Sequence, residues 1–392
     1  MQEAYIVGGF RTAVTKAKKG GFRFMRPDDL AVQVIQGLLK SIPQLEHSLI
    51  DDVIVGNAVP EAEQGLQIGR IISARAVGYD AAGITINRYC ASGLESIAMA
   101  TAKIRSGMAD CIIAGGTESM SLVPTAGWKT VPAYSIAKED PDYYLSMGLT
   151  AEAVAKEYNV SRDDQDQFSV SSHQKAARAI QEGYFKNGIL PIEVSEIYLD
   201  EKGKRQQRNY IVDTDEGVRA DTTSEVLAKL KPAFAVNGTV TAGNASQTSD
   251  GAAFVVVMSA RLMKQLDLEP LARLVGSAVA GVHPRIMGIG PVAAIPKVLK
   301  QCGLSLNDID LIELNEAFAS QALAVIREAG LDSDKVNING GAIALGHPLG
   351  CTGAKLTIQM MHDLQRLNKK YGMITACVGG GQGIAGVIER IY

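Results

Sequence analysis

The sequence of 392 residues is poor in aromatic side chains and in uncompensated charge. Only 5% of the residues are Phe, Trp or Tyr, and the formal net charge at pH 7 is −3. Because nucleic-acid-binding domains carry a strong positive excess, no nucleic-acid partner is expected. No run of about 18 consecutive apolar residues occurs, so no membrane span is expected either.

Cysteine is also scarce, and the five cysteines are scattered without a single C-x-x-C pair. A disulfide framework or a zinc site is therefore not expected, and we predict no metal ligands. The first residues carry no charged region followed by an apolar run, and the last residues are not a peroxisomal address. We expect a protein of the reducing cytoplasm.

Glycine and aliphatic residues are abundant, and their order along the chain predicts an α/β fold. The sequence has 40 glycines, and 46% of its residues are hydrophobic. Val53-Ile54-Val55 and the stretch 110–114 read as short apolar strands that end in small residues, and Pro27 opens a helix. Strands that alternate with helices predict a sheet that is mostly parallel.

A weak internal repeat divides the chain. The stretch 52–57 is followed by a second strand, a glycine-rich helix entry and an apolar strand at Cys111. The stretch 310–315 is followed by the same series, with the helix entry at 350–353 and the last strand at 373–377. Two copies of one βα unit explain this order. We expect the active site where the strand ends of the two copies converge.

The repeat predicts two similar halves with a large insertion. We expect an N-terminal half over 1–120, completed by 245–270, an inserted loop domain over 121–244 that covers the site, and a C-terminal half over 271–392. Within the insertion, Ser161 and Asp164 predict the start of a helix by a capping box. The basic stretch 201–208 is expected to be a solvated loop, with a phosphate contact as the alternative.

The stretch NRYCASGLE places Cys90 between a short strand at 83–86, expected to be buried, and a helix. The free N–H groups and the positive end of a helix dipole stabilise a thiolate, so the pKa of this thiol is expected to be depressed. Small neighbours leave the sulfur open to a substrate. The alternative is a buried structural cysteine.

Three further stretches carry polar side chains at strand ends or glycine turns. Asn315 follows an apolar strand, and its alternative role is a helix N-cap. His347 lies among glycines, and its alternative role is that of a hydrogen-bonded structural residue. Cys377 ends a strand and precedes a glycine run that includes Gly379, which predicts an acid/base thiol beside an oxyanion nest or, alternatively, a phosphate loop.

Together these stretches resemble the thiolase family over nearly the whole chain. The matching motifs are the nucleophile segment at Cys90, Asn-Glu-Ala-Phe at Asn315, Gly-His-Pro at His347 and Cys-x-Gly-Gly-Gly at Cys377. The resemblance implies a thiolase-like α/β fold, with two similar βα halves and mixed sheets sandwiched by helices. It also implies that no cofactor is tightly bound and that coenzyme A is a co-substrate.

The resemblance assigns a role to each catalytic residue. Cys90 is the nucleophile that becomes acylated, and His347 is the base for its proton. His347 and a water held by Asn315 bind the enolate oxygen of the thioester. The backbone N–H groups of Cys90 and Gly379 form a second oxyanion site, and Cys377 exchanges protons with the leaving carbanion and with incoming CoA.

By the same resemblance, further residues contact the substrates. Arg219 and Thr223 resemble contacts to the adenine nucleotide, and Ser246, in the stretch 239–251, resembles a contact to pantetheine. Met147 and Met287 resemble residues that line the acyl pocket.

The implied activity is thiolytic cleavage of 3-ketoacyl-CoA to acetyl-CoA and a shortened acyl-CoA in fatty acid β-oxidation. The implied partners are 3-ketoacyl-CoA, CoA, a second copy of the chain in a homodimer (alternatively a tetramer), and a β-oxidation hydratase/dehydrogenase subunit. Two alternatives stay open: a biosynthetic acetoacetyl-CoA thiolase and a non-catalytic relative that binds CoA or lipid. Ser146 before Met147 favours the degradative type, because biosynthetic members tend to carry a histidine there.

Overall fold

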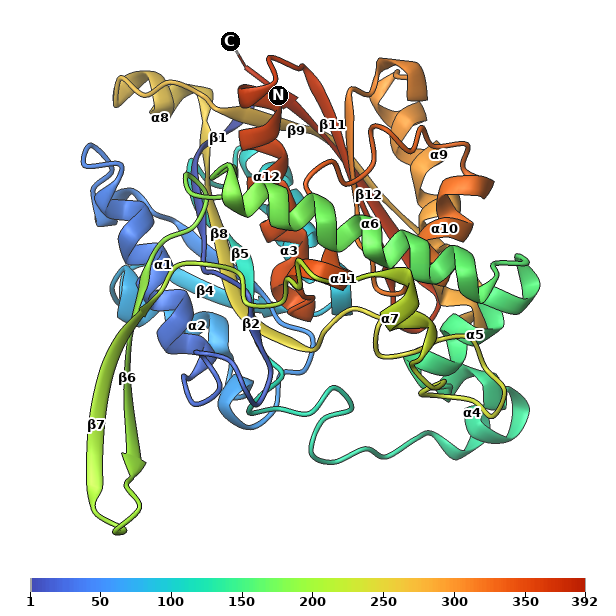
Figure 1. Cartoon of the computed structure of the whole chain (residues 1–392). Coiled ribbons are helices and arrows are strands. Elements are labelled where there is room, and N and C mark those ends of the chain that lie inside the picture. The colour runs from blue at the N-terminus through green and yellow to red at the C-terminus, as the bar shows by residue number, and fades with distance from the viewer. Residues whose placement is uncertain (1, 392) are drawn as a thin grey trace.

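The computed structural model describes residues 2–391, and its strands form one ten-stranded sheet and one separate hairpin (Figure 1). The strands are β1 (Ala4–Arg11), β2 (Thr15–Lys16), β3 (Asp52–Gly56), β4 (Ala82–Ile86), β5 (Cys111–Ser119), β6 (Ile192–Leu199), β7 (Arg205–Val212), β8 (Ser249–Ser259), β9 (Ala272–Gly281), β10 (Leu311–Leu314), β11 (Tyr371–Val378) and β12 (Gln382–Arg390). The helices are α1 (Pro27–Lys40), α2 (Ile68–Ala76), α3 (Ser92–Arg105), α4 (Tyr134–Glu139), α5 (Met147–Glu157), α6 (Arg162–Gln181), α7 (Ser224–Ala228), α8 (Ala260–Gln265), α9 (Gly290–Cys302), α10 (Ala319–Glu328), α11 (Ala342–Leu345) and α12 (Leu349–Arg366).

The strand order confirms the predicted repeat, except that the counterpart of β4 in the second copy is only an isolated parallel bridge between Ile312 and Val336. Nine strands of the sheet run in the order β10-β11-β12-β9-β1-β8-β5-β3-β4, and the short strand β2 pairs with β8 off this path. In the N-terminal part β3 is parallel to β5, and β8 and β1 follow antiparallel. In the C-terminal part β10 is parallel to β11, and β12 and β9 follow antiparallel. The two sets meet where Ile6 of β1 pairs with Ala272 of β9.

Helices cover both faces of each set of strands, and α3 and α12 lie between the two sets (Figure 1). Neighbouring side chains on a strand point to opposite faces. Accordingly Val53 and Val55 of β3 pack with α1 and α2, while Ile54 packs with α3 and α12. In the C-terminal set, α9 and α10 pack on the outer face. The apolar strands are thus buried on both faces, as in sheets with parallel strands.

Glycines allow the two central helices to touch. A Cβ atom on Gly93 of α3 would lie 2.7 Å from the backbone nitrogen of Ala354. A Cβ atom on Gly353 of α12 would lie 2.2 Å from the backbone nitrogen of Leu94. Real Cβ atoms do not approach backbone that closely, so both positions exclude a side chain. This contact brings the N-termini of α3 and α12, and the turns before them, close together.

The segment between β5 and β8 contains α4 to α7 and the β6–β7 hairpin, which projects at the lower left of Figure 1. The predicted capping box is confirmed, because the Ser161 hydroxyl accepts a hydrogen bond from the backbone N–H of Asp164 at the start of α6. The solvated loop predicted at 201–208 is wrong in part, since Arg205 begins β7, which pairs with β6. The predicted domain boundaries stay a prediction.

One further expectation is corrected. The strand before Cys90 was expected to be buried, but β4 is the last strand of the sheet and is half-exposed along its length. It pairs with β3 on one side only, so its apolar residues are not covered as those of a central strand are. Within residues 2–391 we find no helix whose length and apolar character would let it cross a membrane.

Candidate active site

Cys90 lies in a tight turn between β4 and α3. Tyr89, the residue before it, has a φ of +43°, which is rare for a bulky side chain. Two side chains hold this turn. The Asn87 Oδ1 atom accepts the N–H of Tyr89 at 2.8 Å, and the Ser92 hydroxyl donates to the Tyr89 carbonyl oxygen at 2.7 Å. The turn places the thiol at the N-terminal end of α3, as the sequence predicts.

The expected depression of the Cys90 pKa is not found. Burial raises the pKa of the Cys90 thiol to about 12, and hydrogen bonds from the backbone N–H groups of Gly379 and of Cys90 itself act in the opposite direction. The negative charge of Glu118 raises this pKa further. The removal of the thiolate from water therefore raises the pKa more than the helix N-terminus and the two N–H groups lower it. The two N–H groups nevertheless both point at the Cys90 sulfur.

Cys377 lies near the end of β11 and is buried. Burial raises the pKa of this thiol, and the charge of Cys90 is the next largest cause of the rise. The two sulfur atoms are thus close enough to feel each other's charge. The structure brings together the two cysteines that sequence motifs selected from opposite halves of the chain.

Asn315 and Thr352 flank the ring of His347. The Nδ1 atom lies 2.6 Å from the Thr352 hydroxyl oxygen, and the Nε2 atom lies 3.3 Å from the Nδ2 atom of Asn315. Because Thr352 donates its own hydrogen to the Pro348 carbonyl oxygen at 2.9 Å, it accepts a hydrogen from Nδ1. The Nε2 atom then carries the lone pair, as a general base requires.

The His347 ring is buried and neutral. Burial lowers the pKa of His347 to about 3, and the positive charge of Lys355 acts in the same direction. The imidazole is therefore uncharged at neutral pH. In this state it can accept a proton through Nε2 and afterwards donate a hydrogen bond from the same atom.

Asn315 is not the helix cap that the sequence left open as an alternative. It follows β10, but α10 begins only at Ala319, and Phe318 occupies the N-cap position. Its Oδ1 atom is buried and has no hydrogen-bond partner among residues 2–391. A buried amide oxygen without a partner is costly and points to a ligand or water that completes the site.

Ser246 lies beside these residues because its segment runs past them. The backbone N–H of Ser246 donates to the Ala317 carbonyl oxygen at 2.9 Å, directly after Asn315 and Glu316 in the chain. The N–H of His347 donates to the Gln247 carbonyl oxygen at 3.1 Å. The predicted pantetheine segment is thus bonded to the Asn315 and His347 motifs of the C-terminal half.

The two predicted acyl-pocket residues pack together. Met147 at the start of α5 and Met287 belong to one apolar cluster, which also contains Phe318 and Cys377. The Met147 sulfur would lie 3.9 Å from a Cβ atom on Gly379. Flexible thioether side chains therefore border the candidate acid/base thiol and its oxyanion turn.

Arg219 and Thr223 are exposed at the surface. The backbone N–H of Arg219 donates to His173 Nδ1 at 3.1 Å, and Thr223 caps the N-terminus of α7. Their assignment to the adenine nucleotide stays a prediction.

Sequence reasoning missed Glu118 and the role of Thr352. Glu118 is buried, and its Oε2 atom accepts the N–H groups of Ala58 and Gly350, each at 2.8 Å. It therefore joins the loop after β3 to the turn after His347. The single carboxylate of β5, near the end of this buried strand, was the available signal. Among residues 2–391 no cluster of three or more potential metal ligands occurs.

Comparisons with known proteins agree with this geometry. A family model described as "Thiolase, N-terminal domain" matches residues 4–261, and one described as "Thiolase, C-terminal domain" matches residues 268–390. A 3-ketoacyl-CoA thiolase of Bacillus subtilis is 55% identical over 390 residues, covering 99% of this chain and 100% of that protein. A peroxisomal 3-ketoacyl-CoA thiolase 1 of Arabidopsis thaliana is 41% identical over 99% of this chain and 88% of that protein.

A solved structure extends the likeness to three dimensions. The crystal structure of the Bacillus anthracis acetyl-CoA acetyltransferase matches with a TM-score of 0.90 and 39% identity, covering 100% of this chain and 99% of that one. The fold class predicted from the sequence is thereby confirmed.

Proposed function

This chain belongs to the thiolase family, and we propose that it cleaves 3-ketoacyl-CoA with CoA to acetyl-CoA and a shortened acyl-CoA in fatty acid β-oxidation. The observation that carries the proposal is the place of Cys90, which lies beside Cys377 and whose turn packs on α12, the helix that begins two residues after His347. Two thiols and a neutral imidazole suit acyl transfer to and from a thioester.

In the first half of the reaction, His347 accepts the Cys90 proton at Nε2. The Cys90 sulfur then bonds to the keto carbon of the substrate, and the backbone N–H groups of Gly379 and Cys90 stabilise the oxyanion that forms. The bond between the keto carbon and the neighbouring carbon breaks, and its electron pair leaves as the enolate of acetyl-CoA. The protonated Nε2 and a water on Asn315 bind the enolate oxygen, and Cys377 supplies the proton to its carbon.

In the second half, Cys377 removes the thiol proton of incoming CoA. The CoA thiolate attacks the acyl carbon, a second tetrahedral oxyanion forms at the same N–H groups, and Cys90 departs and recovers its proton from His347. The raised pKa of Cys377 suits this exchange, because a thiol that holds its proton at neutral pH can donate it and then regain it from CoA.

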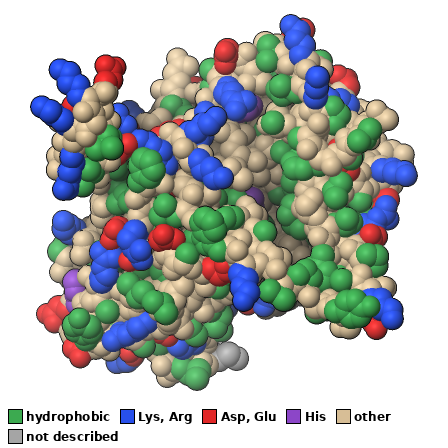
Figure 2. Space-filling view, turned by 90° about the horizontal axis from the view of Figure 1, so that it is seen from below, with side chains coloured by type: hydrophobic (Ala, Val, Ile, Leu, Met, Phe, Trp, Pro, Cys, Tyr) green, Lys and Arg blue, Asp and Glu red, His purple; other side chains and the backbone are tan. Residues whose placement is uncertain are grey.

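The substrate contacts follow the same proposal. Arg219 and Thr223 contact the adenine nucleotide, Ser246 contacts pantetheine, and Met147 and Met287 line the acyl pocket. CoA would be a co-substrate and not a resident cofactor. The molecular face in Figure 2 is hollowed near its middle, and Lys and Arg side chains lie at several places around the hollow, which suits the negative phosphates of CoA.

The remaining assignments extend the proposal beyond the single chain. The protein would act in the cytoplasm as a homodimer, with a tetramer as the alternative. A β-oxidation hydratase/dehydrogenase subunit that produces the 3-ketoacyl-CoA is its proposed partner.

One observation favours a second candidate. The Bacillus anthracis relative is an acetyl-CoA acetyltransferase, so the biosynthetic acetoacetyl-CoA thiolase stays the alternative.

Ser146 immediately before Met147 favours longer chains, because a small side chain leaves room for them and each buried methylene contributes roughly 0.8 kcal/mol.

Thiolysis followed by loss of the enolate absorbance tests the proposal. We expect kcat/KM for 3-ketodecanoyl-CoA to exceed that for acetoacetyl-CoA. Refusal of chains beyond four carbons would favour the biosynthetic alternative. CoA binding without any turnover would favour a non-catalytic relative.

A further inference from the structure

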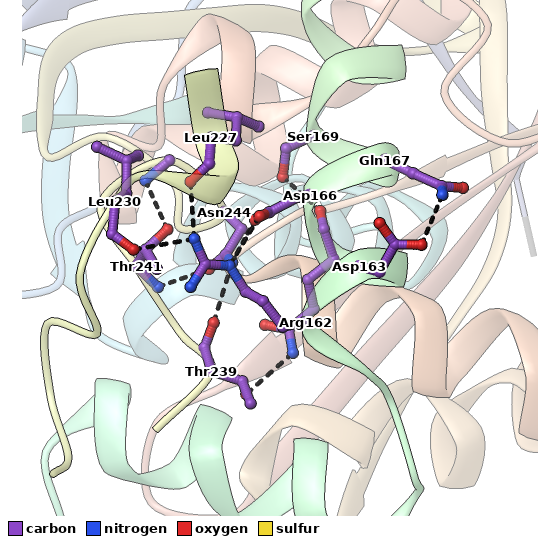
Figure 3. A network of polar contacts seen from close by, with 12 residues as sticks. Arg162, Asp163, Asp166, Gln167, Ser169, Leu227, Leu230, Thr239, Thr241 and Asn244 are labelled. Atoms are coloured by element: carbon purple, nitrogen blue, oxygen red, sulfur yellow. Dashed lines mark hydrogen bonds and ion pairs between the residues drawn. The ribbon is translucent and has the colours of Figure 1, made fainter. Parts of the chain in front are cut away.

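Arg162 begins a polar network that joins α6, α7 and the stretch from Thr239 to Ser249 (Figure 3). Its Nε atom donates to the Asp166 carboxylate at 2.7 Å. Its Nη2 atom donates to the carbonyl oxygens of Leu227 at 2.7 Å and Leu230 at 3.0 Å. Leu227 lies in the last turn of α7 and Leu230 lies just after the helix, so Arg162 adds a side-chain donor to carbonyl oxygens at its C-terminal end.

Asp166 carries the connection onward. Its side chain is 4% exposed, and its second oxygen, Oδ1, accepts a hydrogen bond from the Nδ2 atom of Asn244 at 3.0 Å. Asn244 is fully buried, and its Oδ1 atom accepts the N–H of Thr241 at 2.8 Å. A single carboxylate therefore bridges the guanidinium of α6 and the buried amide of the 239–249 segment, the stretch from Thr239 to Ser249.

The 239–249 segment then runs into the active site. The N–H of Ala319 donates to the Asn244 carbonyl oxygen at 2.9 Å, and Ala245 pairs with Phe318. Thr248 pairs with His347. The segment is thus fixed at one end by the Arg162–Asp166–Asn244 network and at the other by the catalytic histidine.

We propose that Arg162 and Asp166 are positioning residues for coenzyme A, because their hydrogen bonds hold α7 and the 239–249 segment in one fixed arrangement. The inference deepens the proposed function and rests on it, since Thr223 caps α7 and Ser246 lies in the 239–249 segment. Neither positioning residue touches the reacting atoms. A change in the network moves the groups that receive CoA, whereas the Cys90 turn is held by bonds of its own.

The binding experiment uses the full chain with Cys90→Ala, in which CoA binds without turnover, and measures the CoA dissociation constant by calorimetry. We expect Arg162→Met to weaken CoA binding about tenfold or more. Arg162→Lys restores part of the affinity, because an ammonium group keeps the charge but cannot reach all three acceptors in the geometry of a planar guanidinium.

Two further variants keep the test decisive. Asp166→Asn leaves the shape of the side chain unchanged but removes the charge and one acceptor. We expect this variant to weaken CoA binding as well, so it carries the test if Arg162→Met does not fold. Arg327→Met is the matched control, since Arg327 pairs with Asp164 of the same helix at 2.9 Å but at the exposed surface. We expect its affinity for CoA to stay within about twofold of the parent protein.

Kinetics with the Cys90 enzyme separate positioning from general damage. With acetoacetyl-CoA as substrate, Arg162→Met should raise KM for CoA about tenfold while kcat changes less than about threefold. The rate at which iodoacetamide alkylates Cys90 should be the same in Arg162→Met as in the parent enzyme.

The inference is overturned if Arg162→Met and Asp166→Asn bind CoA within about twofold of the parent, or if Arg327→Met weakens binding equally. If the Cys90→Ala parent binds no CoA, the proposed function fails and the inference fails with it. If the parent binds CoA and all variants bind it equally well, only the inference about Arg162 and Asp166 is refuted.

Discussion

The Nδ1 atom of His347 lies 2.6 Å from the hydroxyl oxygen of Thr352, one turn inside α12. The Thr352 hydroxyl donates its hydrogen to the Pro348 carbonyl oxygen, so it can only accept a hydrogen from the ring. The hydrogen of the neutral imidazole therefore lies on Nδ1. The free lone pair of Nε2 then faces Asn315. The proposed general base is therefore oriented by Thr352, to which the sequence analysis assigned no role.

Thr352→Val should reduce kcat/KM for thiolysis by about 10- to 100-fold, because valine fills the same volume but cannot accept the Nδ1 hydrogen. Thr352→Ser should retain most of the activity. Thr357→Val is the control, since Thr357 is buried on the same helix and its hydroxyl donates to the Gly353 carbonyl oxygen at 2.8 Å, within its own helix. Equal activities of the two valine variants would contradict the assigned role.

The alkylation rate of Cys90 should rise with pH without a plateau near neutrality. The pKa of this thiol is raised to about 12 and that of His347 is lowered to about 3, so the resting pair is a thiol and a neutral imidazole. The thiolate fraction, and with it the iodoacetamide rate, should increase about tenfold per pH unit between about pH 7 and pH 10.

Peptide mapping by mass spectrometry checks this prediction, with Cys90→Ser to identify the signal. Cys111 and Cys351 are buried and should label later than Cys90. A rate that levels off below about pH 8 would mean that the resting enzyme holds a thiolate–imidazolium pair instead.

Cys377→Ala should impair turnover by at least ~10²-fold, because it removes both the proton for the enolate and the base for CoA. The same variant should still form some covalent acyl-enzyme on Cys90, visible in the intact mass. Cys111→Ala removes another buried thiol, on β5, and should leave turnover unchanged. Full turnover in Cys377→Ala would assign the proton exchange to another group.

Residues at strand ends were predictable from the sequence because chain order alone places them there. Cys90, Asn315 and Cys377 each lie at or after the end of an apolar strand, and the repeat implied that these ends meet. Such signals are local, and therefore short windows of sequence contain them.

Features that depend on distant contacts or on burial were not predictable. The bond between Asp166 and Asn244 joins residues 78 positions apart, and nothing near either residue indicates it. The pKa of Cys90 was predicted in the wrong direction, because a helix end is visible in the sequence but the removal of water from the folded site is not. The half-exposed position of β4 follows from its place at the sheet edge.

A single-turnover measurement tests the central claim, that cleavage proceeds through an acyl group on Cys90. The protein is mixed with 3-ketodecanoyl-CoA in the absence of added CoA, quenched in acid and analysed by intact mass and peptide mapping. The account predicts an octanoyl group confined to the Cys90 peptide, with one equivalent of acetyl-CoA released and neither product from Cys90→Ala. Acetyl-CoA released without an adduct, or an octanoyl group on another residue, would contradict it.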